Sequence, residues 1–184
     1  MSAHPNDVIA FWSAAGRKKW FAKDDRFDDA IRLRFEPVHH AAARGEYDHW
    51  METAEGSLAL LLLLDQFPRN LWRGSGHAFA TDPKARTIAR LALANGFDTQ
   101  VDPVLRPFFY LPLEHSEDLA DQELCVSLCQ GLMDDVGDEE TLRYAIVHRD
   151  IIARFGRFPH RNRALGRETT TEELAFLEGG GFSG

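Results

Sequence analysis

The chain has 184 residues, 44% of them hydrophobic and 27% charged, which are ordinary values for one globular domain with a sizeable core. Its formal net charge of −8 argues against broad nucleic-acid binding, because such binding needs a basic face that displaces phosphate counterions. The longest apolar run, residues 58–64, is too short to span a bilayer, and nothing resembles a signal peptide, so we expect a cytoplasmic protein that does not bind membranes.

Helical periodicity begins near the N-terminus. His4-Pro5 opens a short helix, and Asp24 or Asp25 can cap a longer one that stops at Gly45. A third helix starts at Thr53. Its leucine-rich centre is apolar on every side, so we expect it to be the buried central helix of the fold.

Proline sets several boundaries farther along. We expect the central helix to end at Asp65-Gln66-Phe67-Pro68, because the residue before a proline disfavours the α conformation. Asp82-Pro83 starts the next helix, since proline is well tolerated at the first helical position. The three prolines between residues 102 and 114 predict mostly irregular structure with one short helical stretch.

Two long helices follow. Ser116 is expected to cap the first, whose apolar positions at helical spacing are Leu119, Val126, Cys129, Met133 and Val136. Gly137-Asp138 breaks the chain, and a second helix carries His148 on its apolar stripe. Thr170-x-x-Glu173 is a capping box before a short terminal helix.

These elements predict an all-α fold, a single compact domain of antiparallel helices over residues 1–178, followed by a flexible Gly-rich tail at 179–184. No strict 34-residue repeat is visible. Cys125 and Cys129, four residues apart on one helix, cannot easily form a disulfide. They are expected to be small core residues of a reducing compartment.

A Phe-Pro turn occurs twice, and each copy gathers polar side chains at a helix end. The first is Leu64-Asp65-Gln66-Phe67-Pro68-Arg69-Asn70. Helix ends need polar partners in any case, so Asp65 can pair with an arginine and Asn70 can cap the next turn. Alternatively, the set points into a pocket.

The second copy is Arg157-Phe158-Pro159-His160-Arg161-Asn162. Residues 143–167 contain seven arginines but only one acidic residue, Asp150. These arginines can pair with Asp65, Glu114, Glu117 or the acidic run 134–140. They can instead form a site for carboxylate or phosphate, which guanidinium groups bind in a bidentate manner. The two turns can also be a pseudo-repeat that meets in space, with Asp65 facing Arg157 or Arg161.

Histidines supply the remaining candidates. His148 lies twelve residues before His160, so the end of its helix can bring both to one pocket, and His115 precedes another helix. A lone histidine on an apolar stripe is otherwise a core residue. The three histidines with Glu114 or Glu117 could also bind a metal, but their spacing matches no metal motif. We therefore expect no metal and no cofactor.

Three of these segments together resemble the bacterial domain-of-unknown-function family numbered 924. They are Leu64 to Asn70, Leu111-Pro112-Leu113-Glu114-His115-Ser116-Glu117, and Arg154 to Asn162 with Leu165-Gly166-Arg167. The resemblance extends from Val8 to about Leu177. It implies a helical fold related to tetratricopeptide-repeat proteins, and it implies no established activity.

The leading hypothesis is a binding module whose polar pocket takes a small anionic ligand or a peptide. One alternative is an enzyme that uses His148 or His160 as general acid and base, oriented by Asp65 or Glu117. Another is a structural scaffold that binds a protein partner. The sequence does not indicate an oligomeric state. The candidate site residues are Asp65, Gln66, Arg69, Asn70, His115, Glu117, His148, Arg157, His160, Arg161 and Asn162.

Overall fold

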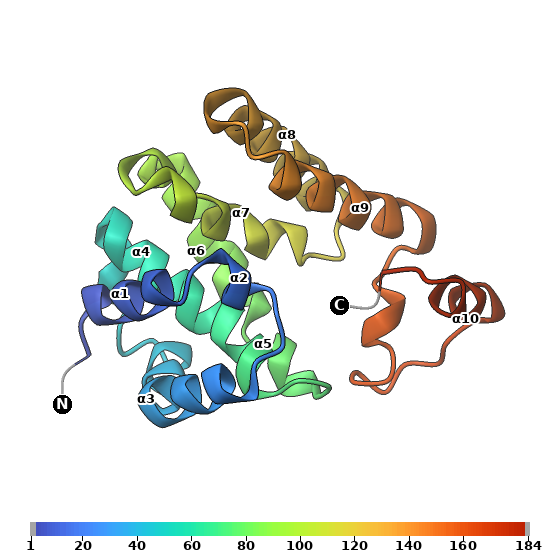
Figure 1. Ribbon diagram of the computed structural model, residues 1–184, viewed down its shortest axis with the longest axis horizontal. Coiled ribbons are helices and arrows are strands. Elements are labelled where there is room, and N and C mark those ends of the chain that lie inside the picture. Colours follow the sequence, from blue (N-terminus) through green and yellow to red (C-terminus); the bar gives the residue numbers. More distant parts are fainter. Residues whose placement is uncertain (1–2, 183–184) are drawn as a thin grey trace. The chain divides into compact units, whose positions relative to one another are not determined.

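The helical periodicity of the sequence is matched by helices throughout the part of the chain that the computed structural model describes, residues 3–182 (Figure 1). No strand occurs in this range, which confirms the all-α prediction. The likeness to tetratricopeptide repeats stays a prediction. None of the helices formed by these residues is long and apolar enough to cross a membrane.

The contacts divide the chain into two compact units. Unit 1 comprises Met1–Arg73 and His77–Pro112, and unit 2 comprises Gly74–Gly76 and Leu113–Gly184. The single-domain prediction stays a prediction beside this division. The elements of unit 1 are α1 (Pro5–Ala15), α2 (Arg17–Trp20), α3 (Asp25–Ala43), η1 (Asp48–Glu52), α4 (Ala54–Leu61), η2 (Leu62–Gln66), α5 (Phe67–Leu71), α6 (Asp82–Ala94), η4 (Phe97–Gln100) and η5 (Pro103–Leu105). The short η3 (Gly76–Phe79) begins at the last residue of the unit 2 segment Gly74–Gly76 and continues in unit 1.

The remaining helices follow in chain order. α7 (Pro107–Glu114) contains the sequence boundary between the units, and unit 2 has α8 (Leu119–Val136), α9 (Glu139–Phe155), η6 (Pro159–Arg161) and α10 (Thr171–Glu178). Capping side chains start several of these helices as predicted. Asp24 accepts hydrogen bonds from two backbone N–H groups of α3, and Thr170 forms a capping box with Glu173.

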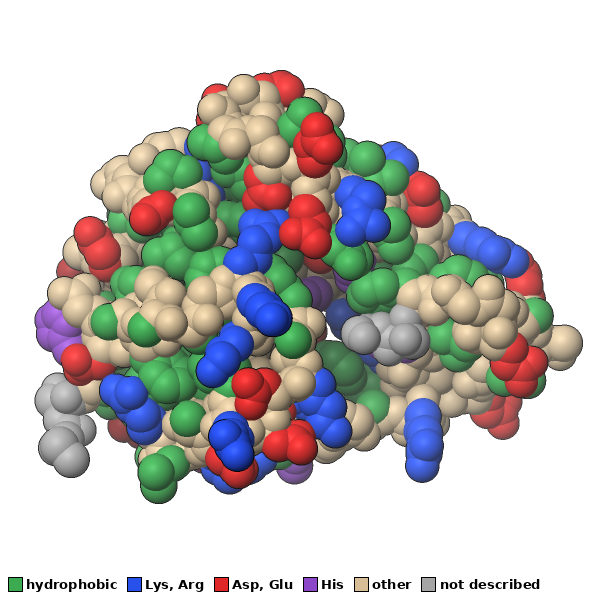
Figure 2. Space-filling model, in the orientation of Figure 1, with side chains coloured by type: hydrophobic (Ala, Val, Ile, Leu, Met, Phe, Trp, Pro, Cys, Tyr) green, Lys and Arg blue, Asp and Glu red, His purple; other side chains and the backbone are tan. Residues whose placement is uncertain are grey.

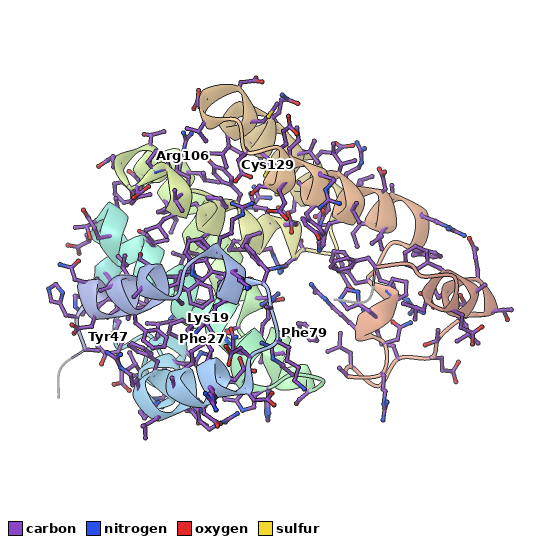
Figure 3. The ribbon with its side chains drawn as sticks, viewed as in Figure 1. Lys19, Phe27, Tyr47, Phe79, Arg106 and Cys129 are labelled. Atoms are coloured by element: carbon purple, nitrogen blue, oxygen red, sulfur yellow. The ribbon has the colours of Figure 1, made fainter. Side chains whose placement is uncertain are left out.

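The central helix of unit 1 is buried as expected. Every residue from Leu58 to Leu64 is at most 1% exposed. Aromatic side chains pack beside it: Trp12 lies 5.5 Å from Phe67 and 5.7 Å from Phe27, measured between ring centroids. Phe27 is labelled on α3 in Figure 3. Burial of this much apolar surface is the main driving force for folding.

The central helix does not end before Pro68, so that prediction is wrong. After α4 the chain makes a π turn, η2, in which the Phe67 N–H bonds to the Leu62 carbonyl, and it continues as α5. Phe67 keeps helical angles (φ −59°, ψ −38°) although a proline follows it. The π turn places Pro68 at the start of a new helical segment, where its missing N–H is tolerated.

Side chains supply hydrogen bonds around this π turn. Pro68 cannot donate to the Leu64 carbonyl one turn earlier, and Thr81 Oγ1 donates to that oxygen at 2.5 Å. His39 Nδ1 lies 2.7 Å from the Leu63 carbonyl oxygen, so Nδ1 carries the proton. The π turn is therefore held by side chains distant in sequence.

Two boundaries in the second half of the chain also differ from expectation. α8 begins two residues later than predicted, because Asp118 and not Ser116 is its N-cap. Ser116 Oγ instead accepts from the Asp118 N–H and donates to Asp121 at 2.6 Å. The segment 102–114 contains η5 and the two-turn helix α7, since Pro103 and Pro107 stand at the first position of a helix, where proline is tolerated.

The buried face of α8 was only partly identified from the sequence. Cys125 and Cys129 are fully buried, and Figure 3 labels Cys129 on this helix, whereas Leu119 and Val136 are exposed. The two end positions follow the helical period but stay exposed, so the helical period alone does not mark the limits of the buried stretch. α8 and α9 are joined by Gly137, whose φ of 76° suits the left-handed turn that ends α8.

Candidate functional site

The first Phe-Pro turn forms an ion cluster in unit 1. Arg69 binds Asp82 with two hydrogen bonds of 3.0 Å, and its Nη1 lies 3.3 Å from Asp65 Oδ1. Asp65 is 1% exposed and also accepts a 2.5 Å hydrogen bond from Gln66. Arg69 Nη1 donates to the Asp65 carbonyl oxygen as well, which ties the side chain to the π turn. The pairing of Asp65 with an arginine is therefore confirmed.

Asn70 has a different role from the capping one considered for it. Its Nδ2 donates to Asp28 Oδ1 on α3 at 2.7 Å. Arg73 binds the same carboxylate through Nε at 2.7 Å and Nη2 at 3.0 Å. Asp28 is buried, so these bonds offset the cost of taking its charge out of water. Asn70 thus connects α5 to α3.

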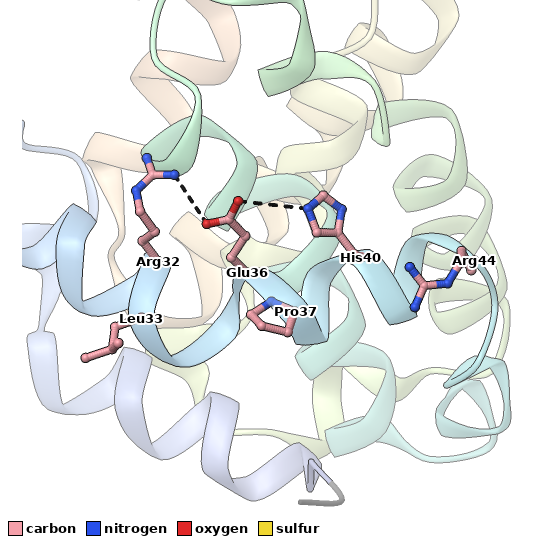
Figure 4. Close-up of a pocket in the computed structure, with 6 residues that line it drawn as sticks. All are labelled: Arg32, Leu33, Glu36, Pro37, His40 and Arg44. Atoms are coloured by element: carbon pink, nitrogen blue, oxygen red, sulfur yellow. Dashed lines mark hydrogen bonds and ion pairs between the residues drawn. The ribbon is translucent and has the colours of Figure 1, made fainter.

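Two surface hollows lie along α3. One, of about 570 Å³, is lined by Arg32, Leu33, Glu36, Pro37, His40 and Arg44 (Figure 4). Glu36 lies between Arg32 at 3.3 Å and His40 at 3.9 Å, so its charge is balanced within the helix. Of the predicted site residues, none lines this hollow, and only Asn70 lines the neighbouring hollow of about 340 Å³.

The predicted histidines gather in unit 2. His148, on α9, is 6% exposed, and its Nδ1 lies 2.9 Å from the Tyr144 carbonyl oxygen and 3.5 Å from Glu114 Oε1. The His115 ring lies 6.5 Å from the His148 ring. His160 packs 5.5 Å from Phe158, and His148 lies 5.5 Å from the same ring. We call His115, His148 and His160 with Glu114 the histidine cluster.

Phe182 also packs against the histidine cluster. Its ring centroid lies 4.5 Å from that of His148 and 5.4 Å from that of His160. Below it, Phe158 packs with Ile151 and Ile152 in a buried apolar cluster. In the C-terminal segment Gly179 to Phe182, the Phe182 ring is packed whereas Gly179 and Gly180 are exposed, so the flexible tail at 179–184 stays a prediction, and residues 183–184 lie outside the described range.

Arg161 and Glu117 approach the same region. Arg161 is 6% exposed, its Nη1 donates to the His115 carbonyl oxygen at 3.0 Å, and its guanidinium lies 4.4 Å from the Phe158 ring centroid. Glu117 binds Arg167 through both oxygens, at 2.8 and 3.0 Å, and accepts the Phe158 N–H at 2.8 Å. Burial raises the pKa of Glu117, but Arg167 and the Phe158 N–H together lower it below its ordinary value.

Arg157 and Asn162 bind a carboxylate that the sequence did not single out as a partner. Arg157 forms two hydrogen bonds with Glu173 of α10, at 2.6 and 2.9 Å. Asn162 Nδ2 lies 3.2 Å from the same carboxylate. Arg157 foremost, with the Thr170 N–H, lowers the pKa of Glu173 to about 2. The capping box was the available signal, because it fixes Glu173 at the start of α10.

Three of the seven arginines of residues 143–167, namely Arg154, Arg157 and Arg167, thus pair with carboxylates from outside that segment. Glu117 was among the expected partners, whereas Glu172, which binds Arg154 at 2.9 Å, and Glu173 were not. Across residues 3–182, no three His, Cys, Asp or Glu side chains are arranged to hold a metal ion, so the metal alternative gains no support. The predicted meeting of the two turns stays a prediction, because the turns belong to different units.

Comparison with known proteins gives a family and a structural relative. The model of a family described as "Bacterial protein of unknown function (DUF924)" matches residues 8–181. A solved structure, described as a protein of unknown function, ATU0120 from Agrobacterium tumefaciens, is 52% identical and has a TM-score of 0.90. The match covers 95% of this chain and 97% of that one. The search of curated proteins gives no match.

Proposed function

Because the chain belongs to the bacterial DUF924 family, whose description assigns no activity, we propose a function from the geometry of the site: a binding module that holds a small anionic ligand at the histidine cluster of unit 2. The observation that carries the proposal is the gathering of His115, His148 and His160 around Phe158. These histidines come from three separate segments of the chain. One helix stripe would not bring them together.

The charges around the cluster support an anion rather than a cation. Arg161 is buried against Phe158, and its guanidinium is always protonated. Imidazole rings add donors near neutral pH. Among the acidic groups, Glu117 is engaged by Arg167, and Glu114 lies 3.5 Å from His148 Nδ1. A carboxylate or phosphate is the ligand chemistry that arginine and histidine recognise best.

The candidate site residues therefore divide into two roles in this proposal. His115, His148, His160 and Arg161 would contact the ligand. The other members support the architecture of each unit: Asp65, Gln66, Arg69 and Asn70 in unit 1, and Glu117, Arg157 and Asn162 in unit 2. Their hydrogen-bond partners are carboxylates, carbonyl oxygens or backbone N–H groups of the chain itself. Such bonds satisfy the polar groups at the ends of helices.

One observation favours an enzyme as the second candidate. His148 Nδ1 faces both the Tyr144 carbonyl and the Glu114 carboxylate, which places the proton on Nδ1 in the neutral ring and leaves Nε2 as a proton acceptor. A histidine oriented by a carboxylate in this way is the arrangement that general-base catalysis uses. Glu114 replaces the orienting residues expected from the sequence, Asp65 or Glu117.

NMR titration tests the binding proposal. The Cε1–H resonances of the histidines are followed while sodium phosphate or sodium acetate is added to the full chain at constant pH and ionic strength. His148 and His160 should shift saturably, and His160→Ala should weaken binding. His49→Ala, at an exposed position of unit 1, is the matched control and should bind as the unaltered chain does. Unsaturable or equal shifts of all histidines would contradict a site at the cluster.

A further inference from the structure

We infer that the place taken by the Phe182 side chain is a subsite for the ring of an aromatic anion, which enters by displacing the C-terminal segment. This inference rests on the proposed function and names its ligand class. Phe182 is half-buried and is the last residue that the structure describes. Its ring is the group now in contact with both His148 and His160.

The walls of this place suit an aromatic ring. The interplanar angles between Phe182 and the two imidazoles are 63° and 76°, so each imidazole meets the phenyl ring in an edge-to-face arrangement. This geometry is favourable because the positive edge of one ring meets the negative face of another. The floor is apolar, formed by Ile151, Ile152 and Phe158. A ligand ring of the same size would make the same contacts.

The glycine run explains how the chain reaches this place. Gly180 has a φ of 83°, in the left-handed region that side chains other than glycine rarely adopt. A Cβ at Gly181 would lie 2.6 Å from the Phe176 ring and from the Phe176 carbonyl oxygen. These two glycines let the chain turn back after α10 and direct Phe182 toward the cluster. The glycines of segment 179–181 thus allow the backbone path that brings the Phe182 ring to the histidine cluster.

Within the described residues, the backbone of this segment is attached to the end of α10. Its recorded backbone bonds run from Gly179 N–H to Ala175, from Gly180 N–H to Leu177 at 3.4 Å and from Gly181 N–H to Phe176 at 2.9 Å, all within the end of α10. Beyond them, the contacts of Phe182 are those of its ring. The tethered Phe182 ring competes with the ring of a free ligand. The apparent affinity for the free ligand is the intrinsic affinity multiplied by the fraction of molecules in which Phe182 has left the subsite.

The charged groups define the rest of the ligand. Arg161 lies 4.4 Å from the Phe158 ring that forms the floor, and its Nη1 already bonds the His115 carbonyl. In the proposed complex, a carboxylate on the ligand ring is held by the imidazoles of His148 and His160, while Arg161 on the adjoining Phe158 ring contributes positive charge. The structure therefore favours an arenecarboxylate, such as benzoate, over an aliphatic acid of similar charge.

The test compares benzoate with acetate in the unaltered chain and in Phe182→Ala, using the histidine resonances and isothermal titration. Phe182→Ala should bind benzoate roughly fivefold more tightly or better, because the competing ring is gone, and acetate affinity should change less. Gly181→Ala, which cannot keep the turn against Phe176, should act in the same direction. Phe21→Ala, at an exposed phenylalanine of unit 1, is the control and should change neither affinity.

The outcomes separate the two proposals. If acetate or phosphate binds at the cluster but Phe182→Ala does not gain affinity for benzoate, the ring subsite is wrong and the anion site stands. If benzoate gains affinity in Phe182→Ala while acetate and phosphate fail to bind either chain, the ring subsite stands without the small-anion site. If none of the three binds either chain, both proposals are wrong. Thermal unfolding of each variant shows whether it is folded, and Gly181→Ala replaces Phe182→Ala if the latter is not.

Discussion

His148 Nδ1 lies 3.5 Å from Glu114 Oε1, and neither residue is more than 6% exposed. We predict that the two side chains are energetically coupled. Glu114→Gln and His148→Gln should each destabilise the chain, and the double variant should lose less than the sum, with a coupling of about 0.5–3 kcal/mol. Each single change is destabilising because removing one buried partner leaves the other without its contact. Urea unfolding of the unaltered chain, the two single variants and the double variant measures the coupling.

The matched control pairs His148→Gln with Glu168→Gln, an exposed carboxylate of unit 2. Those two changes should add within about 0.5 kcal/mol. If the losses from Glu114→Gln and His148→Gln also add, the two side chains do not interact energetically despite their short distance. The enzyme candidate would then lose the carboxylate that orients its base.

The ion pair between Glu173 and Arg157 predicts a pH-dependent loss of stability. The pKa of Glu173 is lowered from 4.5 to about 2 in the folded chain, so the unfolded chain takes up the proton first as the pH falls. The stabilisation by this carboxylate is therefore complete above pH 4.5 and is lost between pH 4.5 and about pH 2. Glu173→Gln should melt at a lower temperature than the unaltered chain at pH 7, and the difference should disappear near pH 2.

Glu172→Gln provides the comparison for that experiment. Glu172 pairs with Arg154, but both side chains are more than half exposed, so its removal should change the melting temperature little at any pH. A Glu173→Gln variant that melts with the unaltered chain at pH 7 would contradict a stabilising role for this pair.

The sequence predicted the helices and the polar clusters better than it predicted their partners. Caps such as Asp24 and Thr170 are local, since the side chain bonds N–H groups two or three residues away, and a pattern along the chain reveals them. The partners of Arg157 and Asn70 are not local. Glu173 and Asp28 lie 16 and 42 residues away, and only packing of the helices brings them close.

The π turn shows a second limit. The rule that a helix ends before proline describes an isolated chain, whereas here distant side chains stabilise the continuation. Thr81 and His39 donate to carbonyl oxygens of the turn, and the residues around Pro68 do not predict these distant donors. The histidine cluster was foreseen in part, because His148 and His160 flank one helix end. Phe182 was not, because a glycine run at a chain end usually indicates a loose tail.

His39 predicts a second pH effect in unit 1. Burial first of all, and then the neighbouring charge of His40, lower its pKa below 6.5, although the bond to the Leu63 carbonyl opposes this. The unfolded chain therefore binds a proton that the folded chain resists, and stability should fall as the pH drops below 6.5 toward the pKa of the folded state. Thermal unfolding at pH 8 and at pH 5.5 should show a larger loss for the unaltered chain than for His39→Gln, whose amide can keep the bond without titrating.

His49→Gln is the control for this titration, since His49 is exposed in unit 1 and is not among the groups that shift the pKa of His39. That variant should lose stability between the two pH values about as much as the unaltered chain does. If His39→Gln shows the same pH dependence as both, the loss comes from other groups and His39 is not its source.

Thr81→Val tests how the π turn is held. The change keeps the shape of the side chain but removes the Oγ1 donor, so the Leu64 carbonyl, in a residue that is fully buried, is left with an unmet hydrogen bond. We expect a loss of about 1–3 kcal/mol in the free energy of unfolding, measured with urea. Thr87→Val is the counterpart: Thr87 also donates to a carbonyl oxygen, that of Pro83, but at an exposed position where water can replace it, so its loss should stay within about 0.5 kcal/mol. Equal losses in the two variants would mean that the π turn does not depend on Thr81.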